Sequence, residues 1–187
     1  METALVVPAR VCWSATLIER SSANDDSQLE ADDSAFHALT DFQHEYPITV
    51  DTDTSIDEAL ADMNRLCVHA LLATESSFEG VDAQVAGLIT AYDIARERPH
   101  SSWRTTRMRP GKHVMVGEIM TPRSELSLVN YESLQALTAL DLYRMFQGTG
   151  LTHLLVIETQ GVDSAVARGL LSRATLARRL RRSSQTA

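Results

Sequence analysis

Long apolar runs and paired cysteines are missing from this sequence of 187 residues. No stretch approaches the roughly 18 to 20 consecutive apolar residues that a membrane span needs. Residues 1–20 show no basic leader followed by an apolar block, so we expect no secretory signal. Cys12 and Cys67 are the only cysteines and share no motif. We expect them to be reduced, partly buried thiols of a cytoplasmic protein, and a disulfide between them stays open.

The compact signatures of catalysis and of metal binding are missing as well. The sequence has no Cys-x-x-Cys pair, no His-Glu-x-x-His, no Gly-x-Ser-x-Gly and no Walker loop. His69 and His153 each begin an apolar run, and we interpret them as cleft-lining or core histidines rather than as metal ligands. We therefore expect no enzyme activity, no metal site and no required cofactor.

Lysine is almost absent, and the charges are divided unevenly along the chain. Lys112 is the one lysine among 17 basic residues. Residues 1–93 hold 18 acidic and 3 basic side chains, a net charge of −15, whereas residues 94–187 hold 7 and 14, a net charge of +7. This division argues against a surface that coats nucleic acid uniformly. Arginine suits phosphate recognition, but an arginine-rich genomic composition explains the same bias.

Two similar stretches organise the rest of the sequence. Gly87-Leu-Ile-Thr90-Ala-Tyr-Asp93 ends an apolar run and starts a helical pattern, and Gly169-Leu-Leu-Ser172-Arg-Ala-Thr175 does the same 82 positions later. Both stretches predict a strand followed at once by a helix. Their repetition indicates an internally duplicated protein.

Each half of the chain follows the order strand, helix, strand, strand, helix. In the first half, Ser55 and Glu58 form a capping box at a helix start. We match Ser55 to Ser133 and His69 to His153, which places six extra residues around positions 146–150. The predicted strands are 48–50, 68–73, 85–89, 127–129, 153–159 and 165–171, and the predicted helices are 56–66, 90–99, 133–145 and 172–182.

The N-terminal part of the chain has a different composition. The apolar residues between Leu5 and Trp13 are compatible with an added edge strand. Residues 21–34 are polar and acidic, and we predict a mobile linker that buries nothing.

These features resemble a tandem pair of CBS (cystathionine-beta-synthase) domains, the arrangement called a Bateman module. The resemblance rests on Gly87-Leu-Ile-Thr-x-x-Asp, the small-residue helix after Ser55, the His-plus-apolar strand of each half, and Gly117-Glu-Ile-Met-Thr-Pro. It covers about residues 40–182 and implies an α+β (α/β-like) fold of two pseudo-symmetric repeats packed through their sheets. The implied domains are an N-terminal extension with a partly flexible acidic linker (1–38), a first repeat (39–99), a basic connector (100–116), a second repeat (117–183) and a tail (184–187).

The resemblance also implies a ligand site at the first helix start. A helix N-terminus favours an anion, and a carboxylate one turn later can accept hydrogen bonds from both hydroxyls of a ribose. Carried over from the family, Asp93 would hold ribose and Thr90 phosphate, while Thr49, His69 and Ala70 would border the adenine base. Thr90-x-x-Asp93 is equally a variant of the capping box, which only starts a helix.

The chain departs from the family's pattern at two places. In the first repeat, Asp41-Phe42-Gln43-His44 stands where a Met-Thr lead-in is expected. In the second repeat, Thr175 stands where the family's nucleotide sites usually have an acid. We therefore expect the second site, formed by Ser172, Thr175, Thr121 and His153, to be weak, empty or altered.

Two basic segments remain as further candidates. Arg104, Arg107, Arg109 and Lys112 in the connector could close over a polyphosphate, or they could form a solvated loop. Residues 178–182 are typical of a helix C-terminus that complements its dipole.

The function that this sequence predicts is a non-catalytic regulatory module that senses an adenosine-containing ligand of the AMP, ADP or ATP class, and so energy state. Its expected partners are the nucleotide, a second copy in a homodimer and an unknown regulated protein, without a membrane. The alternative is a ligand-free dimerisation or protein-interaction module, and a nucleic-acid binder is a more remote one.

Overall fold

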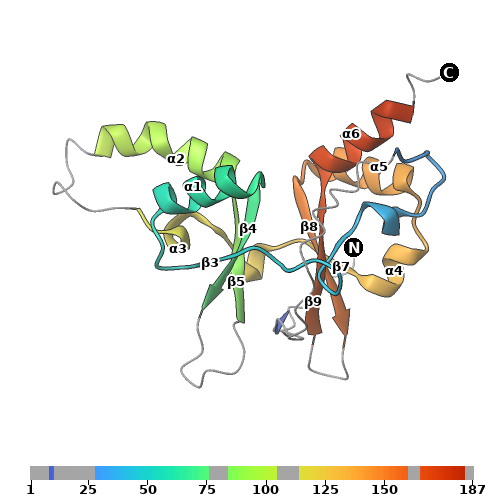
Figure 1. The fold of residues 1–187 in the computed structure, drawn as a ribbon, viewed down its shortest axis with the longest axis horizontal. Helices are drawn as coiled ribbons and strands as arrows, with labels where there is room; N and C mark the ends of the chain where they lie inside the picture. Colours follow the sequence, from blue (N-terminus) through green and yellow to red (C-terminus); the bar gives the residue numbers. More distant parts are fainter. Residues whose placement is uncertain (1–8, 11–27, 76–83, 105–113, 160–164, 184–187) are drawn as a thin grey trace. The chain divides into compact units, whose positions relative to one another are not determined.

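The computed structural model of the protein describes residues 9–10, 28–75, 84–104, 114–159 and 165–183. It divides into two compact units, each with its own sheet and helices (Figure 1). We call Pro47–Leu126 the first-repeat unit, and Met1–Tyr46 together with Ser127–Ala187 the second-repeat unit. Both contain the predicted order of strand, helix, strand, strand, helix, which confirms the mixed α and β fold.

The first-repeat unit is built on a sheet of four strands. Strand β3 runs parallel to β4, β4 pairs antiparallel with β5, and the short β6 pairs antiparallel with β5. Helices α1 and α2 contribute Ile56, Met63 and Ile94 to a core with the buried strand residues Leu71 and Ile89. The elements are β3 (Thr49–Asp51), α1 (Ile56–Leu66), β4 (Ala70–Glu75), β5 (Gln84–Thr90), α2 (Ala91–Arg104), α3 (Val116–Ile119), β6 (Thr121–Pro122) and the 3-10 helix η2 (Arg123–Glu125).

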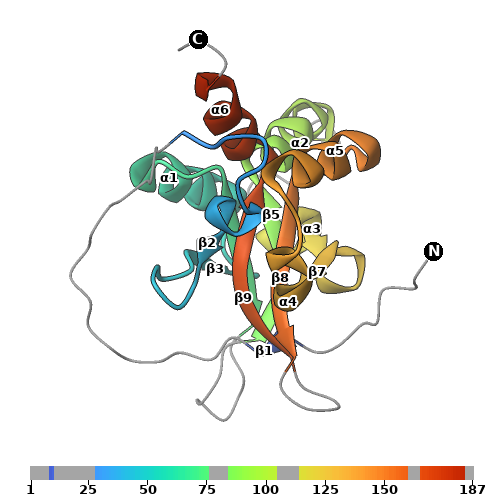
Figure 2. The same cartoon turned by 90° about the vertical axis from the view of Figure 1, so that its right-hand side faces the viewer.

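The second-repeat unit has the same sheet with one more strand. Strand β7 is parallel to β8, β8 is antiparallel to β9, and the far edge of β9 pairs with β1 and β2, of which Figure 2 shows β2 beside β9. Leu142, Phe146 and Leu176 pack from the helices into its core. The elements are β1 (Ala9–Arg10), η1 (Ala35–Ala38), β2 (Thr40–Asp41), β7 (Leu128–Asn130), α4 (Tyr131–Gln135), α5 (Ala139–Thr149), β8 (His153–Thr159), β9 (Ala165–Ser172) and α6 (Arg173–Ser183).

Strand register shows which residues of the two repeats are equivalent. Ala70 pairs with Thr90, and His153 pairs with Ser172. His153 is therefore the counterpart of Ala70, so the match of His153 to His69 is wrong by one residue. The error has a physical origin, because β4 and β8 are apolar on both faces and their letters fit either register.

Helix capping corrects a second match between the repeats. Ser55 caps α1 and Thr138 caps α5, each with a complete capping box. Ser133 lies inside α4 and caps no helix. Helices α1 and α5 both have 11 residues and both end at a left-handed residue, Cys67 and Gly150. The extra residues of the second repeat are thus in α4, before α5, and not around positions 146–150.

A lead-in strand crosses a glycine in each unit. The backbone carbonyl of Thr121 would lie 2.4 Å from a Cβ placed on Gly87, and that of Thr40 would lie 2.4 Å from a Cβ on Gly169. Only glycine allows this approach. Thr40 is thus the counterpart of Thr121. The lead-in of the first repeat was predicted at Asp41–His44, and this position is wrong because the equivalent residues begin at Leu39.

Two further boundaries differ from the sequence-based prediction. Leu29 is 2% exposed and Ala35 is fully buried, so the acidic segment packs against the second-repeat unit from residue 28 on. Helix α2 was expected to end by Pro99 but continues to Arg104. A proline removes one helical hydrogen bond, and the following residues can still resume helical geometry.

Candidate functional site

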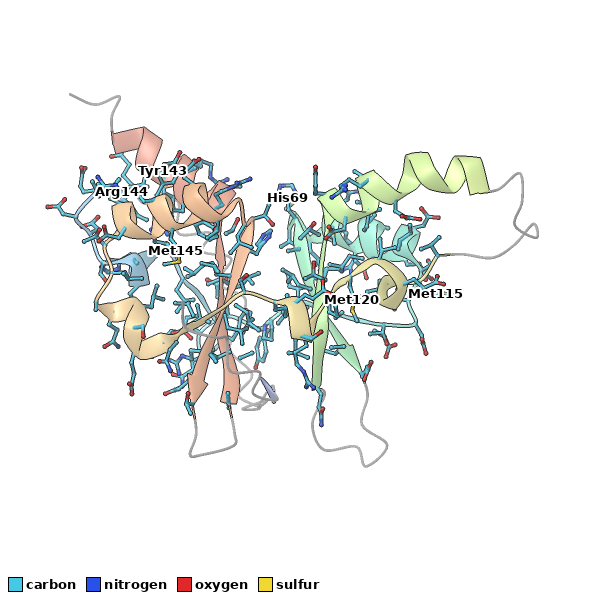
Figure 3. All side chains as sticks on the ribbon, turned by 180° about the vertical axis from the view of Figure 1, so that it is seen from behind. His69, Met115, Met120, Tyr143, Arg144 and Met145 are labelled. Atoms are coloured by element: carbon cyan, nitrogen blue, oxygen red, sulfur yellow. The ribbon has the colours of Figure 1, made fainter. Side chains whose placement is uncertain are left out.

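The end of strand β5 and the start of helix α2 meet the start of β4 at one end of the first sheet. The Ala91 N–H donates to the His69 carbonyl at 2.9 Å, and Thr90 is the register partner of Ala70. Figure 3 shows His69 at the end of the sheet where α2 begins. We call His69, Ala70 and Thr90–Asp93 the first junction. It unites four of the five residues that the sequence predicted for ligand binding.

Thr90 and Asp93 are locked to each other by three hydrogen bonds. The Thr90 hydroxyl and the Thr90 backbone N–H donate to Asp93 Oδ2 at 2.6 and 2.9 Å. The Asp93 backbone N–H donates back to the Thr90 hydroxyl at 3.2 Å. Thr90 is 9% exposed, and Asp93 is half-buried. The pair therefore forms a complete capping box that fixes the position of the Asp93 carboxylate.

The second oxygen of the Asp93 carboxylate is not used by the cap. Within the described part of the chain, Asp93 Oδ1 has no hydrogen-bond partner and no cation in ion-pair distance. An ionised carboxylate oxygen accepts hydrogen bonds through two lone pairs and donates none. The first junction consequently presents a fixed acceptor that fits a hydroxyl-bearing ligand.

Tyr92, the residue before Asp93 in the sequence, has an exposed aromatic ring. Its side chain is 63% exposed, and the Arg96 guanidinium lies 5.7 Å from the ring centroid. Tyr92 was not among the residues predicted from the sequence. An aromatic residue placed between Thr90 and Asp93, where the other neighbours are small, was the signal that could have found it.

Thr49 lies on the neighbouring strand and is not a direct contact of the capping box. It is half-buried on β3 and pairs in register with Leu72, two residues beyond Ala70. The structure thus places it on the same sheet as the first junction, one strand away.

The second junction, Thr152, His153 and Ser172–Thr175, repeats the backbone arrangement without the acid. The Arg173 N–H donates to the Thr152 carbonyl at 3.0 Å, as Ala91 does to His69. The Thr175 N–H donates to Ser172 Oγ at 3.4 Å. Threonine at position 175 has no carboxylate with which to receive the Ser172 hydroxyl. The helix start is capped from one side only, and no fixed acceptor is presented.

The remaining predicted site residues fall outside these junctions. Thr121 lies on β6 in the first-repeat unit, where it pairs with Leu88, and Ser172 belongs to the second-repeat unit. Arg107, Arg109 and Lys112 lie outside the described residues, and of Arg104 only the backbone, at the end of α2, is described.

The described ranges show neither a cluster of metal ligands nor a helix that spans a membrane. Those ranges contain no group of three or more His, Cys, Asp or Glu side chains that could hold a metal ion. None of the helices described is long and apolar enough to cross a membrane. Cys67 is a free thiol at the end of α1 and is exposed, so the expected partial burial is wrong for it; Cys12 lies outside the described residues.

A buried arginine in the second-repeat unit is a feature that the sequence analysis missed. Arg168 is 8% exposed, and its guanidinium lies 3.1 Å from Asp41 Oδ1 and 3.4 Å from Glu158 Oε2. It also donates to the Tyr131 hydroxyl at 3.3 Å and lies 4.6 Å from the centroid of that ring. An arginine within an otherwise apolar strand was the available signal. The cluster binds the lead-in strand β2 to β9, β8 and α4.

Comparison with known proteins identifies the fold. Residues 39–100 match the CBS domain family. A crystal structure of CBSX2 in complex with AMP is similar to 82% of this chain over 97% of its own length, with a TM-score of 0.51 and 21% identity. The CBS domain of a bacterial CNNM/CorC family Mg2+ transporter, in complex with an inhibitor, aligns over 80% and 77% of the two chains, with a TM-score of 0.51 and 11% identity.

A CBS-domain containing protein from Agrobacterium tumefaciens is similar over 74% of this chain and 88% of its own, with a TM-score of 0.50 and 18% identity. No curated protein sequence matches the chain. At these identities the solved structures show the fold, and the family match covers the first repeat. Residues 39–100 therefore match a CBS domain, and the chain has the fold of these CBS-domain structures.

Proposed function

We propose that this protein is a non-catalytic regulatory module that binds an adenosine-containing ligand at the first junction. The observation that carries the proposal is the Asp93 carboxylate, of which Oδ2 is held by Thr90 while Oδ1 is left as a half-buried acceptor. Two neighbouring hydroxyls of a ribose match such an acceptor, because each donates one hydrogen bond to it. CBSX2, which has a similar fold, was crystallised with AMP, and this supports the choice of an adenine nucleotide.

The energetics of this contact set the expected affinity change. Hydrogen bonds to a charged group contribute roughly 1.5–3 kcal/mol each, and about 1.4 kcal/mol changes a dissociation constant tenfold. Loss of the Asp93 carboxylate should therefore weaken binding by at least about tenfold. Ala70 and His69 lie beside Thr90 through the strand register, and their backbone groups would border the base.

Ligand binding would regulate a partner protein in the cytoplasm through thermodynamic linkage. A ligand that prefers one conformation of the module changes the affinity of the partner, and the partner changes the affinity of the ligand by the same factor. Arg104, Arg107, Arg109 and Lys112 are proposed to contact the phosphates when the ligand is ADP or ATP.

A thermal-shift panel tests the proposal on the full chain. AMP, ADP, ATP, S-adenosylmethionine and NADH are each added at about one hundred times a trial dissociation constant, where a bound ligand adds about 2.7 kcal/mol to the stability. We expect a raised melting temperature with an adenine nucleotide. No shift with any of the five compounds would contradict the proposal.

A second candidate function is a ligand-free dimerisation or protein-interaction module. It is favoured by one specific observation, the completeness of the Thr90–Asp93 capping box, since a cap alone explains both side chains. The same panel separates the two functions when it is joined to a measurement of molar mass by light scattering. A homodimer without any nucleotide shift would support this second function.

A further inference from the structure

We infer that residues 28–46 form a strap that opens from the second-repeat unit without unfolding it, and that two buried arginines, Arg168 and Arg179, hold the strap closed. The strap comprises η1, β2 and the turn that follows β2. It contains five acidic residues and neither lysine nor arginine. The inference concerns a part of the molecule other than the first junction, so it does not depend on the proposed function.

Both buried arginines of the described chain contact this strap. Arg168 on β9 is 8% exposed, and its Nε lies 3.1 Å from Oδ1 of Asp41 in β2. Arg179 on α6 is 4% exposed, and its guanidinium donates to the His37 carbonyl at 2.6 Å. A buried cation is costly unless it is paired and hydrogen-bonded. The strap supplies a partner for each of them, from two different elements, so its closure depends on two polar clamps.

The strap adds little apolar surface to the core that it closes. Its buried members of that core are one leucine and two alanines, Leu29, Ala35 and Ala38, and its Phe36 and Leu39 are only partly buried. The rest of the second-repeat unit contributes a phenylalanine, a valine and five leucines to the same core. Because stabilisation grows with the apolar area that is buried, the core retains most of its apolar contacts when the strap is open.

Asp41 couples the Arg168 clamp to the turn that leads out of the strap. Its Oδ1 accepts a hydrogen bond from the Gln43 N–H at 2.9 Å and is the atom next to Arg168 Nε. Its carbonyl accepts the N–H groups of His44 and Glu45 at 3.0 and 2.8 Å. The turn is exposed from Gln43 on. One residue therefore holds both the strap and its hinge, and the two are released together.

The equivalent lead-in of the first repeat is built without this clamp. Strand register places Pro122 at the position of Asp41, and Ala86 at the position of Arg168. Neither residue carries a charge. The close approach of a lead-in strand to the sheet therefore does not require an arginine, and the clamp is a separate property of the strap.

The two states of the strap differ in the surface that they leave free. In the closed state β2 covers the edge of β9, where Thr40 pairs with Leu170 and Asp41 with Gly169. In the open state these backbone groups of β9 lose their partners. An element with two such states is what a regulatory module requires, since a molecule that prefers one state shifts the population toward it.

Two backbone N–H groups at the start of α5 report directly on the strap. The first N–H groups of a helix have no acceptor within the helix. Those of Ala139 and Leu140 donate instead to the strap carbonyls of Asp33 and Ala31, at 2.8 and 3.0 Å. They are protected from exchange with solvent only while the strap is closed.

Native-state hydrogen exchange of the full chain, followed by NMR over a series of urea concentrations below the unfolding transition, tests the inference. We expect the Ala139 and Leu140 amides to exchange through an opening that is more frequent than the one that exposes the amides of β8. This opening should also depend less on urea, because the urea dependence scales with the surface exposed. Equal protection and equal urea dependence of the two sets would overturn the inference, since the strap would then leave only when the whole unit unfolds.

Asp41→Asn tests the first clamp. It removes the charge and keeps an oxygen for the turn, and Glu158 at 3.4 Å still faces Arg168, so the buried cation keeps an acidic partner. We expect the protection of the Ala139 and Leu140 amides to fall by at least about tenfold, because the closed strap loses a buried ion pair.

The second clamp and the controls complete the test. Arg179→Met keeps the apolar stem, removes the donor to His37, and should lower the protection of the same two amides. The Ile56 amide, which starts α1 in the first-repeat unit, should keep its protection in both variants. Asp62→Asn, which removes an exposed ion pair with Arg65 at 2.8 Å, should change none of these amides.

Unchanged protection of the two α5 amides in Asp41→Asn and in Arg179→Met would overturn the role of the arginines. If either variant fails to fold, the urea series on the unsubstituted protein still decides whether the strap opens by itself.

Discussion

The two junctions of this protein share a backbone and differ in one functional group. At the first junction, Asp93 closes the capping box of α2, whereas at the second junction Thr175 leaves the box of α6 without a carboxylate. At both junctions, the first backbone N–H of the helix donates to the carbonyl of a residue that precedes a strand. This residue is His69 before β4 and Thr152 before β8. The comparison teaches that the fold needs the helix start and not the acid. We therefore propose that the acid is the part of the motif that serves the ligand.

A second difference lies in the bulge that both sheets contain. Register shifts between Ala73 and Thr74 and between Val156 and Ile157 leave Ala86 and Arg168 as equivalent, unpaired positions. Ala86 is a half-buried small residue, and Arg168 is a buried cation with two acidic partners. The charged pair that distinguishes the second-repeat unit is thus Arg168 with Asp41 of the lead-in strand. The charged group that distinguishes the first-repeat unit is Asp93 at the start of α2.

The largest expected effect comes from removing the buried cation that distinguishes the second-repeat unit. Replacement of Arg168 by alanine leaves Asp41 buried without its cation, and breaking a buried ion pair costs about 3–5 kcal/mol. We expect a loss of this size in the free energy of unfolding measured by urea titration.

Arg144→Ala is the matched control, since Arg144 is exposed and its Asp141 partner is 3.8 Å away. It should change the stability by no more than about 0.5 kcal/mol. Equal effects of the two substitutions would show that the Arg168 cluster does not hold the second-repeat unit together.

The glycines under the lead-in strands should give the next largest effect, and a similar one in both repeats. A Cβ on Gly87 or Gly169 would meet a backbone carbonyl at 2.4 Å, which side-chain motion cannot relieve. We expect Gly87→Ala and Gly169→Ala each to destabilise by about 1–3 kcal/mol in chemical denaturation.

Gly148→Ala serves as the control for these two substitutions. It lies within α5 with nothing within 4 Å of an added Cβ, and alanine is the better helix former. It should leave the stability unchanged or raise it by up to about 1 kcal/mol. A destabilised Gly148→Ala, or a neutral Gly87→Ala, would contradict the close approach of the lead-in strands.

A smaller effect is expected when the second junction is given the missing acid. Thr175→Asp supplies a carboxylate at the third helical position, where Ser172 and the helix dipole stabilise it. We expect α6 to gain about 0.5–1 kcal/mol, seen as a raised melting temperature. A lowered melting temperature would show that the two helix starts are less alike than their backbones indicate.

The smallest expected effect concerns the Glu45 carboxylate, which lies near Asp41. Partial burial raises the pKa of Glu45, and the Asp41 carboxylate adds to the rise while His44 opposes it. The folded protein therefore holds this proton more tightly than the unfolded chain, so the contribution to stability is present below the ordinary pKa of 4.5 and is lost as pH rises through the raised value.

Glu45→Gln should consequently be slightly more stable than the unsubstituted protein at pH 7 and indistinguishable from it near pH 4. Thermal melts at both pH values measure this difference. A stability gain at pH 4 that disappears at pH 7 would have the opposite sign and would exclude burial as the cause.

The order of the elements was predictable from the sequence because periodicity and capping are local signals. The capping box at Ser55, the glycine at position 87 and the strand at 153–159 all stand in the structure as predicted. The prediction of a cap at Ser133 failed, because serine and threonine both cap helices. Only Thr138 is followed three residues later by an acid, Asp141, which completes the capping box in the structure.

The parts that local reading missed depend on contacts between distant segments. Arg168 meets Asp41, 127 positions earlier in the chain, and Leu29 is buried against the second-repeat core despite its acidic neighbours. Neither contact leaves a periodic signal. At the candidate site, the sequence identified Asp93 and Thr90 and left open whether they serve a ligand or only cap the helix. The structure shows the capping hydrogen bond between them.

The most direct measurement of the central claim is a calorimetric titration of AMP into Asp93→Ala and Asp141→Ala. Both substitutions remove the aspartate of a Thr-x-x-Asp capping box, and the pKa of the exposed Asp141 is lowered by the Thr138 hydroxyl bond that the box supplies. The account predicts that Asp93→Ala weakens AMP binding by at least about tenfold while Asp141→Ala binds as the unsubstituted protein does. Equal affinities of the two variants would contradict it, because Asp93 would then be a helix cap and nothing more.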